Sequence, residues 1–108
     1  MDINTNPLAK ELKILGDEKR FMIVSLLLEF DLCVEALAAR LDISKSAVSQ
    51  HLKILRDAGF VRGEKRGYFT HYSVDRGRLI RISGQLMEMA EIRKSKCNSG
   101  SRCCGDRE

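Results

Sequence analysis

Apolar residues recur at helical spacing along most of the chain, beginning near its start. Proline suits the first turn of a helix, so we expect a short helix from Pro7 to about Leu15, which Gly16 then ends. Asp17 is a suitable N-cap for a second helix, in which apolar residues again recur every three to four positions. The recurring residues of this second helix are Phe21, Val24 and Leu28.

Two more helices follow, separated by a short turn. The third carries apolar residues at positions i, i+3, i+4 and i+7 and stops at a turn formed by Asp42 and Ile43. Ser44 caps the fourth, and Gly59 follows Ala58 where a left-handed residue usually closes a helix. The pattern of the third helix consists of Val34, Leu37, Ala38 and Leu41, and the inward stripe of the fourth consists of Val48, Leu52 and Leu55. This order predicts a helix-turn-helix.

The pattern changes to that of strands after the fourth helix. Aromatic and β-branched residues from Phe60 to Arg66 and from Tyr68 to Val74 surround a tight turn at Arg66 and Gly67, which predicts a β-hairpin. A hairpin directly after a helix-turn-helix forms a wing. The expected fold class is therefore mainly α with a small β-hairpin, a winged helix-turn-helix.

A long last helix is predicted from about Arg76 to Lys94. Its apolar arc is too wide for a lone surface helix, so we expect part of it to face a second subunit. The apolar residues are Leu79, Ile80, Ile82, Leu86, Met87 and Met89. Residues 1–94 then form one DNA-binding and dimerisation domain, and residues 95–108, rich in Ser, Gly, Cys and charge, form a flexible cysteine-rich tail.

Composition limits the function classes. With 108 residues and 44% hydrophobic content the chain can build one domain, and its net charge of +4 favours a polyanionic partner. No apolar run is long enough to span a membrane, and Met1 to Lys10 lack the features of a signal peptide, so we expect a cytoplasmic protein. Thiols stay reduced in that compartment, so the four cysteines indicate metal binding or redox sensing rather than disulfides.

The helix-turn-helix and the wing supply the candidate DNA-binding residues. With the apolar stripe turned inward, polar side chains of the fourth helix can reach a major groove, and its N-terminus can bind a phosphate. These side chains are Lys45, Ser46, Ser49, Gln50 and Lys53, with Lys53 equally well explained as part of a solvated face. His51 lies beside the apolar stripe, where half-buried packing competes with a phosphate contact. Lys65, Arg66 and Gly67 form a basic loop at the wing tip, which can follow the DNA backbone or place Arg66 in a minor groove. His71 is expected to be merely exposed.

The segment from Leu15 to Val74 resembles the arsenical-repressor, or ArsR/SmtB, family of winged-helix metal sensors. The matching pieces are LGDEKRFMIVSLL and DLCVEALAARLDISKSAVSQHLKILRDAGFVRGEKRGYFTHYSV. The resemblance implies that the DNA contacts of the fourth helix fall on Lys45, Ser46, Ser49, Gln50 and His51, and that Arg66 and Gly67 lie at the wing tip. It also implies a homodimer paired through the first and last helices.

The candidate effector site needs a separate argument. DLCVEAL resembles the family's arsenic motif of two cysteines one residue apart, but only Cys33 matches and Glu35 stands in the second position. The family's zinc site on the last helix needs histidines, which this helix lacks. The tail instead offers Cys97, Cys103 and Cys104, three thiols within eight residues, beside basic residues that favour the thiolate form. Three soft donors suit As(III) or Sb(III) as the effector.

Other interpretations of the cysteines remain open. The tail thiols are also compatible with Cd(II), Pb(II) or Zn(II), or with redox sensing, and Cys33 is equally compatible with a small buried residue. A thiol oxidoreductase is disfavoured because the chain has no CxxC motif, so we expect no enzyme activity. A metal carrier on the same scaffold would show no sequence-specific DNA binding. The expectation is a homodimeric repressor that binds double-stranded operator DNA and is released by a thiophilic metalloid.

Overall fold

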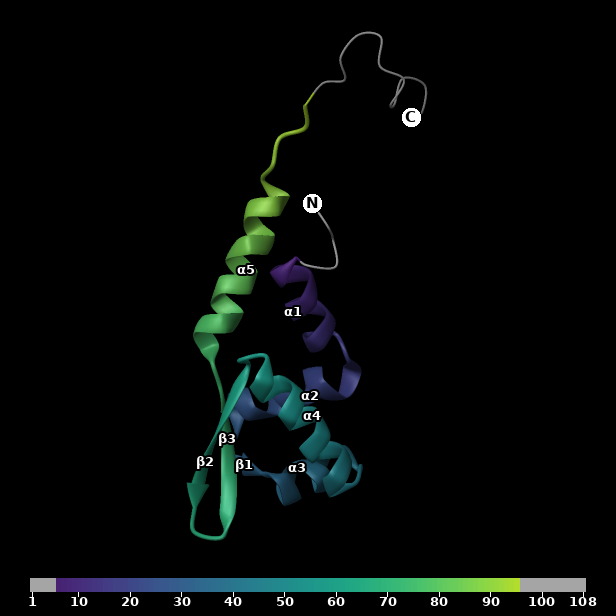
Figure 1. Cartoon of the computed structure of the whole chain (residues 1–108), viewed down its shortest axis with the longest axis vertical. Coiled ribbons are helices and arrows are strands. Elements are labelled where there is room, and N and C mark those ends of the chain that lie inside the picture. Colours follow the sequence, from purple (N-terminus) through teal and green to yellow (C-terminus); the bar gives the residue numbers. More distant parts are fainter. Residues whose placement is uncertain (1–5, 96–108) are drawn as a thin grey trace.

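The computed structural model describes residues 6–95, and within them helices and strands alternate in a fixed order. The elements are α1 (Pro7–Leu15), α2 (Glu18–Glu29), β1 (Leu32–Cys33), α3 (Val34–Leu41), α4 (Lys45–Asp57), β2 (Val61–Arg66), β3 (Phe69–Val74) and α5 (Arg76–Ala90). Helices α2, α3 and α4 cluster beside the sheet, whereas α1 and α5 extend together away from the hairpin tip (Figure 1). The expected winged helix-turn-helix, mainly α with a small β-hairpin, is confirmed.

The helices begin where capping residues satisfy the free amides of a first turn. The Asp17 carboxylate accepts a hydrogen bond from the Arg20 amide at 3.1 Å, and the Ser44 hydroxyl accepts one from the Ala47 amide at 3.0 Å. Asp42 turns the chain between α3 and α4 with a left-handed φ of 55°. Each of these local predictions is confirmed.

The core forms where the apolar stripes of α2, α3 and α4 meet the base of the hairpin. The fully buried side chains include the predicted stripe of α4 together with Phe60, which precedes β2 instead of opening it. Helix α2 buries Ile23, Val24 and Leu27, whereas the side chain of Phe21 is exposed. The buried apolar residues are Ile23, Val24, Leu27, Leu32, Leu37, Ala38, Leu41, Val48, Leu52, Leu55, Phe60, Val61 and Ile82.

The sheet contains one strand more than the sequence predicted. Strand β1 pairs antiparallel with β3, giving the order β1-β3-β2. Strand β1 has only two residues, which is too short for any periodicity to reveal it. The hairpin turn also differs by one position, because Arg66 pairs with Phe69 and the two-residue loop is therefore Gly67 and Tyr68. Gly67, with φ 66°, supplies the positive φ that such a turn requires at its first position.

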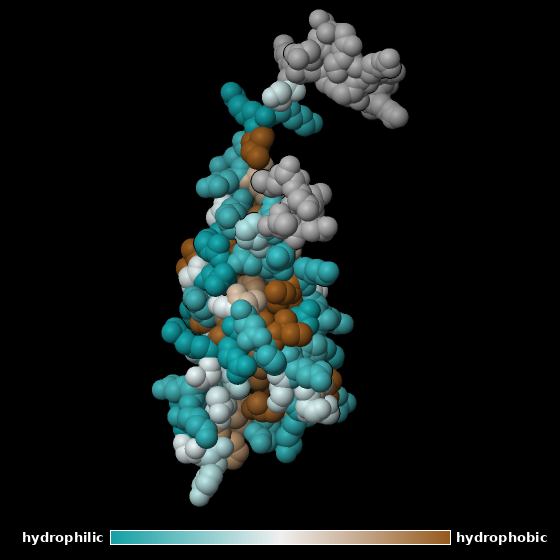
Figure 2. Space-filling view, viewed as in Figure 1, coloured by the Kyte–Doolittle hydropathy of each residue, from teal (hydrophilic) through white to brown (hydrophobic). Residues whose placement is uncertain are grey.

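Helix α5 ends at Ala90, four residues before the predicted end. The Ile92 amide bonds to the Met89 carbonyl at 3.2 Å, so the chain leaves the helix through a tighter turn. Only Ile82 of α5 is buried among the residues described. Figure 2 shows separate brown, hydrophobic patches among hydrophilic side chains in the part of the molecule that α5 occupies in Figure 1. None of the described helices is long and apolar enough to cross a membrane.

A buried carboxylate joins the two protruding helices. Glu11 of α1 accepts hydrogen bonds at Oε2 from Arg78 and Arg81 of α5, both at 2.6 Å. Burial raises the pKa of Glu11, but the two guanidinium groups lower it more, so this pKa lies below its ordinary value. Glu11 is therefore ionised near neutral pH and fastens α1 to α5.

Candidate nucleic-acid interface

Helix α4 presents a continuous polar stripe to solvent. Ser46, Ser49, Gln50 and Lys53 are spaced at i, i+3, i+4 and i+7 and are all exposed. The stripe of Val48, Leu52 and Leu55 is buried on the other side. Hydroxyl and amide groups both donate and accept hydrogen bonds, so the exposed stripe has the chemistry needed to contact base edges.

The N-terminal half of α4 and the wing tip face each other across a groove. The groove has a volume of about 330 Å³. Lys45 and Ser49 line it from α4, and its lining residues are Val34, Glu35, Lys45, Ser49, Tyr68, Phe69, Thr70 and Tyr72. The start of α4 and the wing tip thus lie at the same end of the molecule, opposite the free end of α5 (Figure 1).

Tyr68 is a candidate contact residue that the sequence reasoning missed. It is the second residue of the wing turn, and its side chain is 99% exposed. An aromatic ring this exposed has no structural role within the described subunit, whereas it suits contact with a sugar or a base. The sequence signal was its place directly after the turn glycine, next to the basic pair Lys65 and Arg66.

Two predicted contact residues of α4 already have partners within the subunit. His51 is half-buried, with Nδ1 3.4 Å from Nη1 of Arg20 and 4.0 Å from Oδ2 of Asp17, which favours the packing interpretation over a phosphate contact. Lys53 forms an exposed ion pair with Asp57 at 3.1 Å. By contrast, Lys45 and Lys65 make no ion pair within residues 6–95.

The wing arginine is also engaged. Arg66 donates to Asp31, in the loop before β1, and to Glu64 at 3.2 Å. The Arg66 hydrogen bond lowers the pKa of Asp31, and the Asp31 carboxylate raises the pKa of Arg66. Whether Arg66 and its neighbour Gly67 contact DNA stays a prediction.

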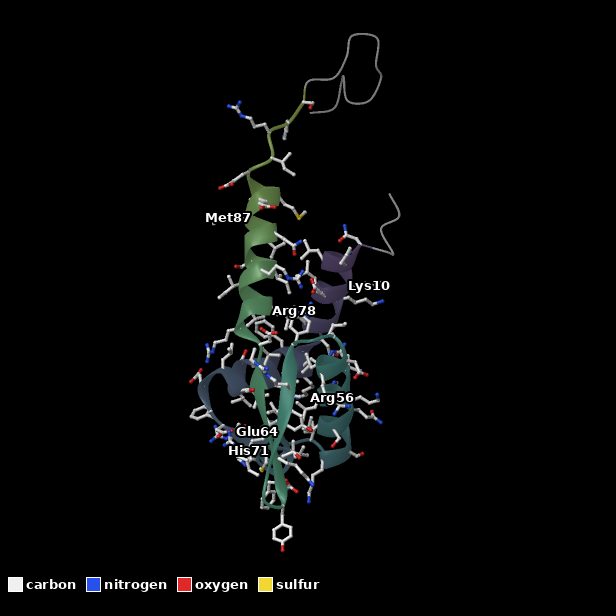
Figure 3. The ribbon with its side chains drawn as sticks, turned by 60° about the vertical axis from the view of Figure 1, so that its left-hand side comes forward. Lys10, Arg56, Glu64, His71, Arg78 and Met87 are labelled. Carbon is white, nitrogen blue, oxygen red and sulfur yellow. The ribbon has the colours of Figure 1, made fainter. Side chains whose placement is uncertain are left out.

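The expectation that His71 is merely exposed was wrong. Its side chain is 25% exposed, and Nδ1 donates to Oδ1 of Asp31 at 3.0 Å. His71 and Glu64 lie close together on the hairpin in Figure 3, as their direct opposition in the sheet register requires. The histidine therefore takes part in the network that holds the wing.

The described part of the chain contains one of the four cysteines. Cys33 is half-buried at the start of α3, where its side chain makes no capping hydrogen bond. Within residues 6–95, no group of three or more His, Cys, Asp or Glu side chains is arranged to hold a metal ion. Cys97, Cys103 and Cys104 lie outside the described residues.

Comparison with known proteins places this arrangement in a family. Residues 17–62, from the cap of α2 into β2, match the family described as bacterial regulatory protein, arsR family. The arsenical resistance operon repressor of Escherichia coli (strain K12) is 46% identical over 61 residues, which cover 56% of this chain and 52% of the repressor. The chain thus matches about half the length of that relative.

Two further similarities extend over more of the chain. The transcriptional activator HlyU of Vibrio cholerae is 36% identical over 74 residues, covering 68% of each protein. The solved structure of an ArsR-like transcriptional regulator from Rhodococcus sp. RHA1 superposes with a TM-score of 0.70 at 30% identity, covering 78% of this chain and 79% of that one. The winged helix-turn-helix described above therefore belongs to the arsR family of bacterial regulatory proteins.

Proposed function

We propose that the chain is a homodimeric transcriptional repressor that binds inverted-repeat operator DNA and leaves it when C-terminal cysteines capture As(III) or Sb(III). The observation that carries the DNA-binding half is the exposed polar stripe of α4 beside the wing. The function is one of binding and release, without catalysis. Relatives named as regulators, among them a repressor and an activator, support control of transcription.

DNA binding divides between base reading and phosphate contact. Ser49 and Gln50 lie at the centre of the exposed stripe, where they can hydrogen-bond to base edges in a major groove. Ser46 lies one turn earlier, close to the N-terminus of α4, whose free amides attract a phosphate. Lys45 and Lys65 are cations without carboxylate partners in the described subunit, so they are available to phosphates on either side of the groove. Gly67 and Tyr68 at the wing tip complete the surface.

Dimerisation follows from apolar surface that one subunit leaves uncovered. The exposed fractions of Ile80, Met87 and Ile92 are 69%, 62% and 73%. Met87 lies far along α5 from the hairpin, in the part of the helix that extends beyond the core (Figure 3). A two-fold pairing of α1 and α5 would cover this surface and place two α4 helices on successive half-sites of DNA.

The proposed effector site consists of Cys97, Cys103 and Cys104. As(III) takes three thiolates in a trigonal pyramid, and a short stretch with three cysteines can supply them without a fourth ligand. Cys33 by itself cannot, because it is the single cysteine of the described residues and no metal-holding group surrounds it there. The name of the E. coli relative supports an arsenical effector, whereas a Staphylococcus aureus relative named as a cadmium resistance regulatory protein supports the alternative of Cd(II).

A route from the tail to α4 runs through α5. The tail follows α5 after residues 91–94, and Arg78 near the other end of α5 binds Glu11 of α1 and lies against Gly59, just after α4. A shift of α5 on effector binding would therefore change the position of α4. A coupling of about 1–3 kcal/mol suffices to weaken DNA binding roughly 5- to 150-fold.

Operator binding titrated in parallel with arsenite, antimonite, cadmium, zinc and peroxide tests the proposal. Specific binding that arsenite or antimonite reverses at the lowest concentration supports it. Release by cadmium or zinc alone would show that another thiophilic ion is the effector. Release by peroxide alone would favour a redox sensor. Absence of any preferred DNA sequence would refute the proposed regulator and favour a metal carrier.

A further inference from the structure

We propose that Asp31 is a positioning residue for DNA binding, holding Arg66 so that this arginine fixes the angle of the wing instead of contacting a phosphate. The inference rests on the proposed DNA-binding function and refines the role of the wing. It concerns a carboxylate that lies outside both the helix-turn-helix and the hairpin, in the loop between α2 and β1.

The carboxylate of Asp31 joins the loop before β1 to both strands of the hairpin. Oδ2 accepts from Nη1 of Arg66, and Oδ1 accepts from Nδ1 of His71 at 3.0 Å. Arg66 and Glu64, two residues apart on β2, and His71, opposite Glu64 on β3, project from the same face of the sheet. Cys33 pairs with His71, so the loop before β1 enters beside that face and Asp31 can close the network.

The outer half of the wing depends on this network. Strand β1 pairs with β3 only at Tyr72 and His71, so no third strand accompanies the hairpin beyond His71. Among the described residues, Arg66–Asp31 is the one side-chain hydrogen bond that joins the four tip residues 65–68 to the body of the subunit. Two strands alone form a marginal unit, so this contact restricts how the wing can bend.

The charge balance argues against a phosphate contact by Arg66. Its guanidinium already has two carboxylate partners, Asp31 and Glu64, and a phosphate would have to displace them while lying close to their negative charges. Lys65, adjacent in sequence, has no ion pair within the described residues and can take the phosphate role. In the wing, Arg66 thus fixes the position of the hairpin and Lys65 contacts the phosphate.

The two roles predict opposite signs for Asp31→Asn. If Arg66 only positions the wing, losing its partner weakens operator binding roughly 2- to 5-fold, as expected when an exposed ion pair outside the contact surface is lost. If Arg66 contacts a phosphate, removing a competing negative charge frees it and tightens binding. Glu29→Gln is the matched control, because Glu29, Asp31 and Arg66 all line a second groove, separate from the one between α4 and the wing, but Glu29 makes no ion pair among the described residues. This control should leave binding unchanged or slightly tighter.

Two further measurements separate the roles. Arg66→Ala should leave the salt dependence of binding unchanged, whereas Lys65→Ala should reduce its slope by roughly one. Asp31→Asn combined with Arg66→Ala should be no weaker than either single variant, because both remove the same contact. Tighter binding of Asp31→Asn, or a slope reduced by one in Arg66→Ala, would overturn the inference.

Amide hydrogen exchange without DNA tests the positioning directly. Asp31→Asn should accelerate exchange at residues 65–70 while Glu29→Gln does not, and thermal melting should show that both variants remain folded. Unchanged exchange at the tip would refute the inference even if DNA binding fell. If the wild-type chain bound no preferred DNA sequence, the proposed function would fail. Hydrogen exchange at residues 65–70 would then still show whether the contact between Asp31 and Arg66 restricts the wing.

Discussion

The guanidinium of Arg78, on α5, lies directly over the α-carbon of Gly59, which closes α4. A Cβ atom at position 59 would fall 2.2 Å from Nη2 of Arg78. Gly59 also has a φ of 84°, a conformation that favours glycine. The same guanidinium binds Glu11 of α1 at 2.6 Å, so one side chain joins the end of the DNA-facing helix to both helices proposed to form the dimer.

This contact predicts that Gly59→Ala destabilises the fold by about 2–3 kcal/mol, since the positive φ disfavours alanine and the displaced Arg78 side chain would lose its bond to Glu11. Gly67→Ala is the control, because Gly67 has a φ of 66° but open space around it. That variant should lose only about 1 kcal/mol from strain. Urea unfolding measures the free energy of unfolding of both variants. Equal losses would show that the contact with Arg78 contributes nothing.

Glu11 should make stability depend on pH in the acid range. Its pKa is below the ordinary value of 4.5 in the folded chain, so its stabilising contribution is complete above pH 4.5 and is lost as the pH falls through the lower folded pKa. Glu11→Gln should therefore cost about 1–3 kcal/mol at pH 7 and less at low pH. Asp17 and Asp31, whose pKa values are also lowered, contribute with the same sign and remain in the variant.

Unfolding free energies of wild type and Glu11→Gln between pH 3 and 7 check this prediction. Glu18→Gln serves as control, because Glu18 is exposed and makes no ion pair within residues 6–95. A constant difference between wild type and Glu11→Gln at every pH would contradict the role of the ionised carboxylate.

The exposed stripe of α4 should distinguish operator from random DNA. Ser49→Ala and Gln50→Ala each remove base contacts and should weaken operator binding by about 1–3 kcal/mol with little effect on random DNA. Lys45→Ala should weaken both and reduce the salt slope by roughly one. Fluorescence anisotropy at several salt concentrations measures all three. If Ser49→Ala and Gln50→Ala lost equal affinity for operator and random DNA, α4 would not be the helix that reads the bases.

The uncovered face of α5 should control assembly. Leu86→Lys or Met87→Lys places a charge in the proposed interface and should convert the dimer to monomers and abolish operator binding. Ile54→Lys is a matched control, since Ile54 on α4 is 41% exposed and Leu86 is 42% exposed. Sedimentation velocity at micromolar concentration measures the oligomeric state of the wild type and of each variant. A monomeric wild-type chain, or dissociation by Ile54→Lys alone, would contradict the assignment.

The tail cysteines should govern release but not binding. Cys97→Ser, Cys103→Ser or Cys104→Ser should each leave operator affinity unchanged and abolish release by arsenite, because two thiolates are too few for the ion. Cys33→Ser, at the N-cap of α3, is the control and should change neither property. A chain truncated after Lys96 that still responds to arsenite would place the sensor elsewhere, and loss of response in Cys33→Ser would bring α3 into the site.

The sequence by itself determined the features that depend on neighbours within a few residues. Asp17 and Ser44 cap helices because their side chains reach amides three residues away, and Val48, Leu52 and Leu55 share a face because a helix repeats every 3.6 residues. The polar stripe on the other face of α4 follows from the same periodicity. These local rules were enough to predict the winged helix-turn-helix and most of its candidate DNA-binding residues.

Only the tertiary structure decided which distant groups meet. Arg66 and Asp31 are 35 residues apart, and Arg78 and Glu11 are 67 apart, so no periodicity relates them. Helical spacing along α2 also did not reveal that Phe21 is exposed, because the packing of α2 against α3 and α4 selects which of its apolar residues are buried. Charge alone made Arg66 a plausible DNA contact. Its partner Asp31 depends on the loop before β1 lying beside the wing, because ion pairing depends on proximity in space.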